Sequence, residues 1–246
     1  MRAPPWRLAL AALGVVTACE PTAPEPALEP AAEPAPPVDA RRCKPGPGAT
    51  GSPSTIAEAV ALTNTLPFPV TAECLVEALD RPLRIEASKS RLSVQPADGE
   101  RSPRVFVWTA DSLVMTIAVD GEGRDLVEFG QFVTPRRSIK GELKFPLTAP
   151  ASLADALARV RNPEFPNITS CFVCHDRERD EPTIPGARSS LALRPKPSSL
   201  VAIEALRDER ERCDATVEPA RCQWFAALFD HGPIEHRPFD PELRLF

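Results

Sequence analysis

Short runs of alternating apolar and polar residues dominate the chain between residues 50 and 149. Leu83 and Ile85 alternate with polar neighbours in this way, which is typical of a strand with one buried face. Turn-forming residues such as Asp120-Gly121 separate the runs. The pattern predicts strands over residues 83–87, 92–94, 105–109, 113–119, 126–133 and 139–145. We therefore expect residues 50–149 to form a small antiparallel β-sandwich or barrel.

After residue 149 this alternation gives way to apolar residues spaced as on amphipathic helices. Helices are predicted over about residues 153–160, from Ser198 or Ser199 to Arg212, and from Pro219 to just before Gly232. A short helix over about residues 56–62 is expected to begin with a capping box formed by Thr55 and Glu58. The predicted fold class is α+β, with the β-rich region 50–149 followed by a mainly helical region 150–246.

Residues 1–18 have the pattern of a signal peptide, with a positive start and an apolar run too short to span a bilayer as a permanent helix. The run ends in Val16-Thr17-Ala18-Cys19, which resembles the lipobox of bacterial lipoproteins. This resemblance implies that acylated Cys19 anchors the chain to a lipid bilayer of the cell envelope. Glu20 then favours the outer membrane, with the protein facing the periplasm or the cell surface. The alternative is an ordinary secretory peptide that leaves Cys19 as a free thiol.

The composition predicts a tether after the signal peptide and a negative net charge for the rest of the chain. Residues 19–49 are rich in Pro, Ala and Glu, which predicts an extended tether without a core of its own. The 246-residue chain has a formal charge of −5, and residues 1–18 hold two arginines and no acid, so the remainder carries −7. The basic residues are scattered rather than gathered in a stripe. These features argue against a nucleic-acid partner and favour a basic protein partner.

Four of the seven cysteines are candidates for disulfide bonds in an oxidising compartment. They are Cys43, Cys74, Cys213 and Cys222, and four cysteines allow three pairings. Cys213 and Cys222 are close in sequence across a predicted helix-to-helix turn, so we favour that pair. Cys43 and Cys74 would then connect the end of the tether to the first folded region.

The remaining two cysteines belong to Cys171-Phe172-Val173-Cys174-His175, called here the attachment segment. Random placement produces such a pattern in roughly two of a thousand chains of this composition, so the spacing is informative. The segment resembles the haem-attachment site of c-type cytochromes. The resemblance implies one covalent haem, with thioethers at Cys171 and Cys174 and His175 as axial ligand of the iron. The alternative is a structural Cys171–Cys174 disulfide with His175 as a bystander.

The order of helix, attachment segment, loop and two helices also resembles small class I cytochromes c, over about the last 90 residues. The usual distal methionine is missing, because the only methionines are Met1 and Met115. The candidates for a sixth iron ligand are therefore His231 and His236, and the third option is an open position. His231 has an alternative role as a cation at a helix C-terminus.

The β-rich region offers little chemistry of its own. It contains no histidine, and its acids lie mostly in turns or on polar strand positions. Trp108 could stack on a ligand, although a tryptophan in a strand is more often part of a core.

The sequence therefore predicts a lipid-anchored c-type haem protein that transfers single electrons in the cell envelope to a redox partner protein. We expect an electron carrier rather than an enzyme. A peroxidase-like or thiol-redox enzyme is a weaker alternative, because the segment lies in no βαβ unit. A haem-free binding or scaffolding lipoprotein, with Cys171–Cys174 as a disulfide, is the alternative from another class.

Overall fold

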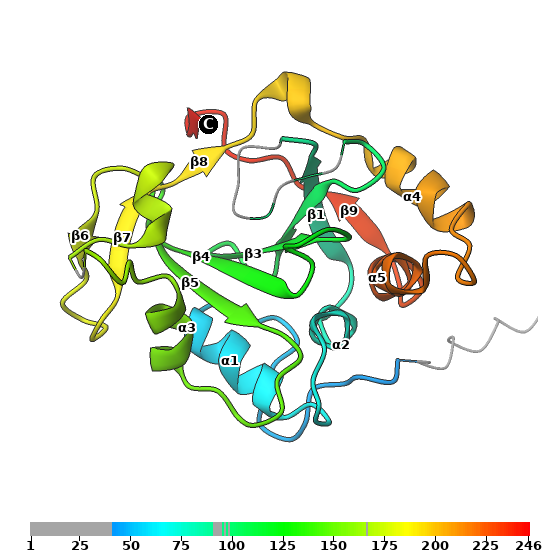
Figure 1. Ribbon diagram of the computed structural model, residues 1–246, viewed down its shortest axis with the longest axis horizontal. Helices are drawn as coiled ribbons and strands as arrows, with labels where there is room; N and C mark the ends of the chain where they lie inside the picture. Colours follow the sequence, from blue (N-terminus) through cyan, green and yellow to red (C-terminus); the bar gives the residue numbers. More distant parts are fainter. Residues whose placement is uncertain (1–40, 91–94, 96, 98, 166) are drawn as a thin grey trace, which may run out of the picture. The chain divides into compact units, whose positions relative to one another are not determined.

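The structure is a computed structural model that describes residues 41–246 except 91–94, 96, 98 and 166 (Figure 1). The predicted signal peptide, Cys19 and most of the tether lie outside the described residues, as does the strand predicted at 92–94. The described residues belong to one compact unit. In this described part of the chain, no helix is long and apolar enough to cross a membrane.

An eight-stranded mixed sheet organises the structure (Figure 1). Its centre is an antiparallel meander of β1 (Leu83–Ser88), β2 (Arg104–Trp108), β3 (Leu113–Ala118), β4 (Leu126–Thr134) and β5 (Arg137–Lys144). The later strands β7 (Arg188–Leu191) and β6 (Arg179–Asp180) extend the sheet beyond β5. At the other edge, β9 (Ile234–His236) lies parallel to β1. A separate two-stranded sheet joins β8 (Leu193–Arg194) to β10 (Arg244–Leu245).

The predicted fold class, a small β-sandwich or barrel followed by a mainly helical cytochrome c-like domain, is wrong. The main sheet takes strands from both sides of residue 149, because β6, β7 and β9 come from the region predicted to be mainly helical. These strands are two to four residues long. Such short strands contain too few residues to show an alternating pattern, and they are held instead by pairing with strands distant in sequence.

The helices are short, and most of them begin where the sequence predicts. They are α1 (Ile56–Asn64), α2 (Ala72–Glu77), α3 (Leu153–Arg159), α4 (Ile203–Glu211) and α5 (Pro219–Phe229). The 3₁₀ turns η1 (Ser170–Val173) and η2 (Pro197–Ser199) complete the set in the described residues. Thr55 caps α1 by accepting from the N–H of Glu58 (3.1 Å), but the Glu58 carboxylate accepts from Ser54, so the predicted capping box is only half formed. At α3, Ser152 and Asp155 form a reciprocal capping box instead. Pro219 occupies the first turn of α5, as predicted. The helix predicted from residue 198 is divided into η2 and α4, and α2 was not predicted.

The two faces of the sheet have different partners. Val107, Met115 and Phe129 are fully or nearly fully buried in one core with residues from all five helices. Their strand neighbours point the opposite way, and Phe106 and Trp108 join a second, smaller core with residues of the C-terminal segment. We call the side of the sheet that carries Arg104, Phe106, Trp108, Glu128 and Lys140 the far face. The strands predicted for this meander are confirmed, but the expectation of one buried face is wrong for β2 and β3, which are buried on both faces.

Both favoured disulfides are confirmed. Cys43–Cys74 ties the first described residues to α2, across a separation of 31 residues. Cys213–Cys222 joins the end of α4 to α5, across 9 residues. Cys171 and Cys174 remain free thiols.

Candidate functional site

The attachment segment forms one tight turn built on η1. The Oγ1 atom of Thr169 caps this turn by accepting a hydrogen bond from the backbone N–H of Cys171 (3.1 Å). The carbonyl of Cys171 then accepts from the N–H groups of Cys174 (3.1 Å) and His175 (2.8 Å). The turn therefore presents two thiols and an imidazole from five consecutive residues, with Cys171 partly buried and Cys174 exposed.

The ring of His175 is held in one tautomer. Its Nδ1 atom lies 2.8 Å from the carbonyl oxygen of Leu191, at the end of β7. A carbonyl only accepts hydrogen bonds, so Nδ1 carries the hydrogen and Nε2 keeps its lone pair. Burial, assisted by the positive charges of Lys140 and Arg104, lowers the pKa of His175 to about 3. The imidazole is therefore neutral near pH 7, with Nε2 in the form that binds a metal.

A buried carboxylate fixes the start of the turn. Glu178 accepts a hydrogen bond from the backbone N–H of Thr169 (2.8 Å) and contacts the Thr169 hydroxyl as well. Arg188 of β7 pairs with the same carboxylate at 3.4 Å, and the Glu178 side chain is only 3% exposed. Because Thr169 in turn caps Cys171, the contacts run from β7 through Glu178 to the first thiol.

The charged part of the sheet's far face provides the electrostatic surroundings of the segment. Burial lowers the pKa of Lys140 to about 8, while the nearby Cys171 and Glu128 act in the opposite direction. The Lys140 ammonium donates a hydrogen bond to Ser138 Oγ (2.7 Å). Burial raises the pKa of Glu128 and lowers that of Arg104, and these two groups offset each other's shifts.

Because of these surroundings, the two thiols differ in their expected reactivity. Burial raises the pKa of Cys171 to about 11, although Lys140 partly opposes the shift. Cys174 is exposed. Since only the thiolate reacts with alkylating agents, Cys171 is the protected thiol of the pair.

We predict that iodoacetamide at pH 8 modifies Cys174 at least about tenfold faster than Cys171 in the haem-free protein. Peptide mapping by mass spectrometry over a time course measures both rates in one sample. The variant Lys140→Gln should slow Cys171 further and leave Cys174 unchanged, because it removes the positive charge that favours the Cys171 thiolate. Equal rates in the parent protein would contradict this account.

The backbone turns sharply just after the segment, at Arg177. This residue has φ of 59°, in the left-handed region that favours glycine. The conformation aims the Arg177 carbonyl at the guanidinium of Arg137, which donates a hydrogen bond to it (2.8 Å). The neighbouring carbonyl of Asp176 accepts from the N–H of Leu191 (3.2 Å), so the turn attaches the segment to the sheet edge.

We predict that Arg177→Gly raises the free energy of unfolding by about 0.5 kcal/mol, because glycine relieves a strained φ at some cost in chain entropy. Arg179→Gly is the matched control. It lies two residues further on, in β6, and should lower stability. Urea unfolding of the two variants measures both effects, and a loss of stability in Arg177→Gly would contradict the prediction.

The structure does not bring the two remaining histidines to His175. His231 Nε2 lies 3.7 Å from Glu77 of α2, within the helical layer on the other side of the sheet. His236 lies in β9 and its Nε2 is 3.1 Å from Glu86. Leu191, which holds His175, belongs to β7, and β7 and β9 are six strand positions apart in the sheet.

Sequence reasoning found the attachment segment but not the residues that hold it. No pattern in the sequence marked Glu178, Leu191 or Lys140. Their roles depend on contacts between segments distant in sequence or on a backbone carbonyl. Exposed apolar side chains also gather along this part of the chain: Phe165 is 58%, Phe172 41% and Val173 88% exposed. Among the described residues, no group of three or more His, Cys, Asp or Glu side chains is arranged to hold a metal ion by itself.

Comparison with known proteins adds no further assignment. No described protein family, no curated protein and no solved structure matches the chain.

Proposed function

We propose that the chain carries one haem, bound covalently through Cys171 and Cys174, and transfers single electrons in the cell envelope. The observation that carries this proposal is the hydrogen bond from His175 Nδ1 to Leu191, which leaves Nε2 available in the same turn that carries two unpaired thiols. The other four cysteines of the described chain are all bonded to each other. Within residues 41–246 as described, the segment is thus the one place where neighbouring cysteines stay available for another partner.

The residues of the segment fit the chemistry of haem attachment. Each thiol would form a thioether by adding its sulfur to one carbon of a vinyl group and its hydrogen to the other. His175 would supply Nε2 to the iron, and the Leu191 carbonyl would orient the ring and increase its basicity. The bound group supplies a one-electron redox couple at the iron. Phe172 and Val173, which are exposed, offer apolar surface for contact with a porphyrin.

The placement of His231 and His236 supports an iron whose sixth position is not filled by a histidine. Each is paired with a buried glutamate at a distance from the segment. Electron paramagnetic resonance of the oxidised protein distinguishes the cases, because bis-histidine ligation gives a low-spin signal. A low-spin signal that is lost in His231→Ala or His236→Ala would contradict this part of the proposal.

The location in the envelope rests on the sequence and on the two disulfides. Disulfides persist in exported proteins, which agrees with a signal peptide over residues 1–18. We propose acylation of Cys19 and attachment to the outer membrane. Mass spectrometry of the mature N-terminus tests it: two or three acyl chains on Cys19 are expected, and none in Cys19→Ser.

The decisive experiment is a pyridine haemochrome spectrum of the full chain made in a host with a cytochrome c maturation system. A c-type spectrum that survives denaturation and acid-acetone extraction is expected. It should disappear in Cys171→Ala/Cys174→Ala and remain in Cys213→Ala/Cys222→Ala, which removes two other cysteines. A folded parent protein without haem, with a Cys171–Cys174 disulfide in its peptide map, would refute the proposal and favour a haem-free binding or scaffolding lipoprotein.

A further inference from the structure

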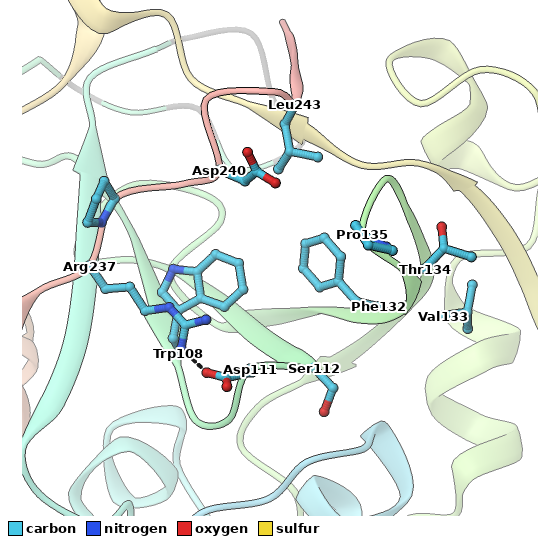
Figure 2. A pocket seen from close by; sticks show the side chains of 11 residues that line it. Trp108, Asp111, Ser112, Phe132, Val133, Thr134, Pro135, Arg237, Asp240 and Leu243 are labelled. Carbon is cyan, nitrogen blue, oxygen red and sulfur yellow. Dashed lines mark hydrogen bonds and ion pairs between the residues drawn. The ribbon is translucent and has the colours of Figure 1, made fainter.

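A cavity of about 410 Å³ opens on the far face of the sheet, away from the attachment segment's own residues (Figure 2). Three parts of the chain form its walls: the turn between β2 and β3, the end of β4, and the C-terminal segment that follows β9. The volume falls in the range of small-molecule sites. The cavity shares no residue with the haem site proposed above, so the inference that follows is independent of it.

Two aromatic rings form the floor of this cavity. Trp108 and Phe132 lie with their ring centroids 5.6 Å apart and their planes at 23°, and Figure 2 shows them side by side. Phe239 supports Trp108 with an edge-on contact at 5.2 Å. Trp108 is 94% buried in the second core, whereas Phe132 is only partly buried. The floor is therefore rigid, and its accessible half is the ring of Phe132.

Charged groups of both signs stand around this floor. The guanidinium of Arg237 lies 4.3 Å from the centroid of Trp108 and donates a hydrogen bond to Asp111 (2.9 Å). Asp111 also pairs with Arg84 at 3.4 Å. Across the opening in Figure 2, the exposed Asp240 lies on the C-terminal segment above the two rings. One of its oxygens accepts from the N–H of Glu242 (2.8 Å), and the described contacts leave the other available.

This arrangement selects against ligands with a net charge. A cation would approach Asp240 but meet the guanidinium of Arg237, and an anion would meet Asp240 and Asp111. A neutral ring that carries hydroxyl groups satisfies both sides, because a hydroxyl donates to a carboxylate and accepts from a guanidinium. The electron-rich face of Phe132 suits the C–H face of such a ring.

We propose that this cavity binds a neutral saccharide ring. The C–H face of the sugar lies on Phe132, one or more hydroxyls donate to Asp240, and another accepts from Arg237. Asp111 acts as a positioning residue, since it holds the guanidinium of Arg237 over the indole. The ligand class is a neutral pyranoside or the terminal unit of a neutral glycan.

Saturation-transfer NMR and calorimetry on the full chain test the proposal with small probes. The neutral probes are the methyl pyranosides of glucose, galactose, mannose and N-acetylglucosamine, and the charged ones are glucosamine and glucuronate. At least one neutral probe should bind with a dissociation constant of the order of 1 mM, about fivefold tighter than both charged analogues. Failure of all four neutral probes to bind, or tighter binding of a charged probe, would overturn it.

Matched variants locate the binding. Phe132→Leu should weaken binding of the neutral probe about tenfold and Asp240→Asn about fivefold. The controls Phe165→Leu and Asp208→Asn change an exposed phenylalanine and an exposed aspartate elsewhere, and should leave binding unchanged. Since Phe132 also packs on the second core, a thermal unfolding curve accompanies its variant. Asp240 is exposed, so its variant tests the site without that complication, and unchanged binding in Asp240→Asn would refute the proposed geometry.

Discussion

Replacing Glu178 with alanine is expected to lower the free energy of unfolding by about 2 kcal/mol, the largest effect we predict for a single substitution near the attachment segment. The Glu178 side chain is 3% exposed, and its removal leaves the N–H and the hydroxyl of Thr169 without their acceptor. Arg188 loses one of its two carboxylate partners and keeps Asp180 (2.5 Å). The expected loss comes mainly from the buried donors of Thr169, because a buried donor without an acceptor costs about 1–3 kcal/mol. Urea unfolding of the haem-free protein measures the change.

Glu178→Ala should also loosen the turn that carries the thiols. Thr169 caps Cys171, so amide hydrogen exchange at Cys171, Cys174 and His175 should become faster, and the yield of covalent haem should fall. Glu178→Gln keeps the shape and part of the hydrogen bonding, and should produce about half the loss of stability. Glu164→Ala is the control, because Glu164 is exposed in the preceding loop. A similar effect of Glu164→Ala and Glu178→Ala would contradict the proposed role of Glu178 in fixing the start of the turn.

The second large effect is a loss of stability at low pH. We expect the haem-free Cys171→Ala/Cys174→Ala protein to lose stability as the pH falls from about 6.5 towards 3, with a contribution from His175 of up to about 1.4 kcal/mol per pH unit. Burial holds the pKa of His175 at about 3 in the folded chain, against about 6.5 when unfolded. Between these values the unfolded state binds a proton that the folded state does not, so acid favours unfolding. Above pH 6.5 both states are neutral, and the contribution no longer changes.

A difference measurement isolates this contribution from the acids that titrate in the same range. Adding His175→Gln to the double variant removes the imidazole, while Lys140 and Arg104, the charged groups that act on it, stay in place. Urea midpoints at pH 7, 5 and 4 should converge between the two proteins as the pH falls, because only the protein with His175 takes up the extra proton on unfolding. Parallel pH profiles would show that His175 is not held neutral.

Local features of the fold were predictable where a few neighbouring residues decide them. Thr55 and Ser152 cap α1 and α3, and Pro219 begins α5, because such signals act within one helical turn. The disulfide pairing followed from sequence distance and compartment. The strands of the meander could be read because each has enough residues to alternate. In contrast, Ile234 pairs with Leu83, and no local pattern predicts a partner so distant in sequence.

The residues of the candidate site were likewise predictable only where the pattern is local. Cys171, Cys174 and His175 form a contiguous pattern, so they could be found directly. The error lay in extending the resemblance from this segment to the order of the surrounding elements, since the residues around it form a sheet edge rather than a helical domain. The acceptor for His175 is a backbone carbonyl, which any residue at position 191 would provide, and Glu178 looked like one of many surface acids. Their roles depend on burial and on the pairing of β5 with β7.

The position of β9 in the sheet has a consequence for the order in which the chain acquires its structure. Its partner β1 is synthesised about 150 residues earlier and stays an unpaired edge until the C-terminus exists. The Cys171 and Cys174 thiols are therefore synthesised before the strand that completes the sheet, and covalent modification can precede closure. A chain that ends at Pro233 would keep the open edge of β1, where another chain can pair, and we expect it to aggregate.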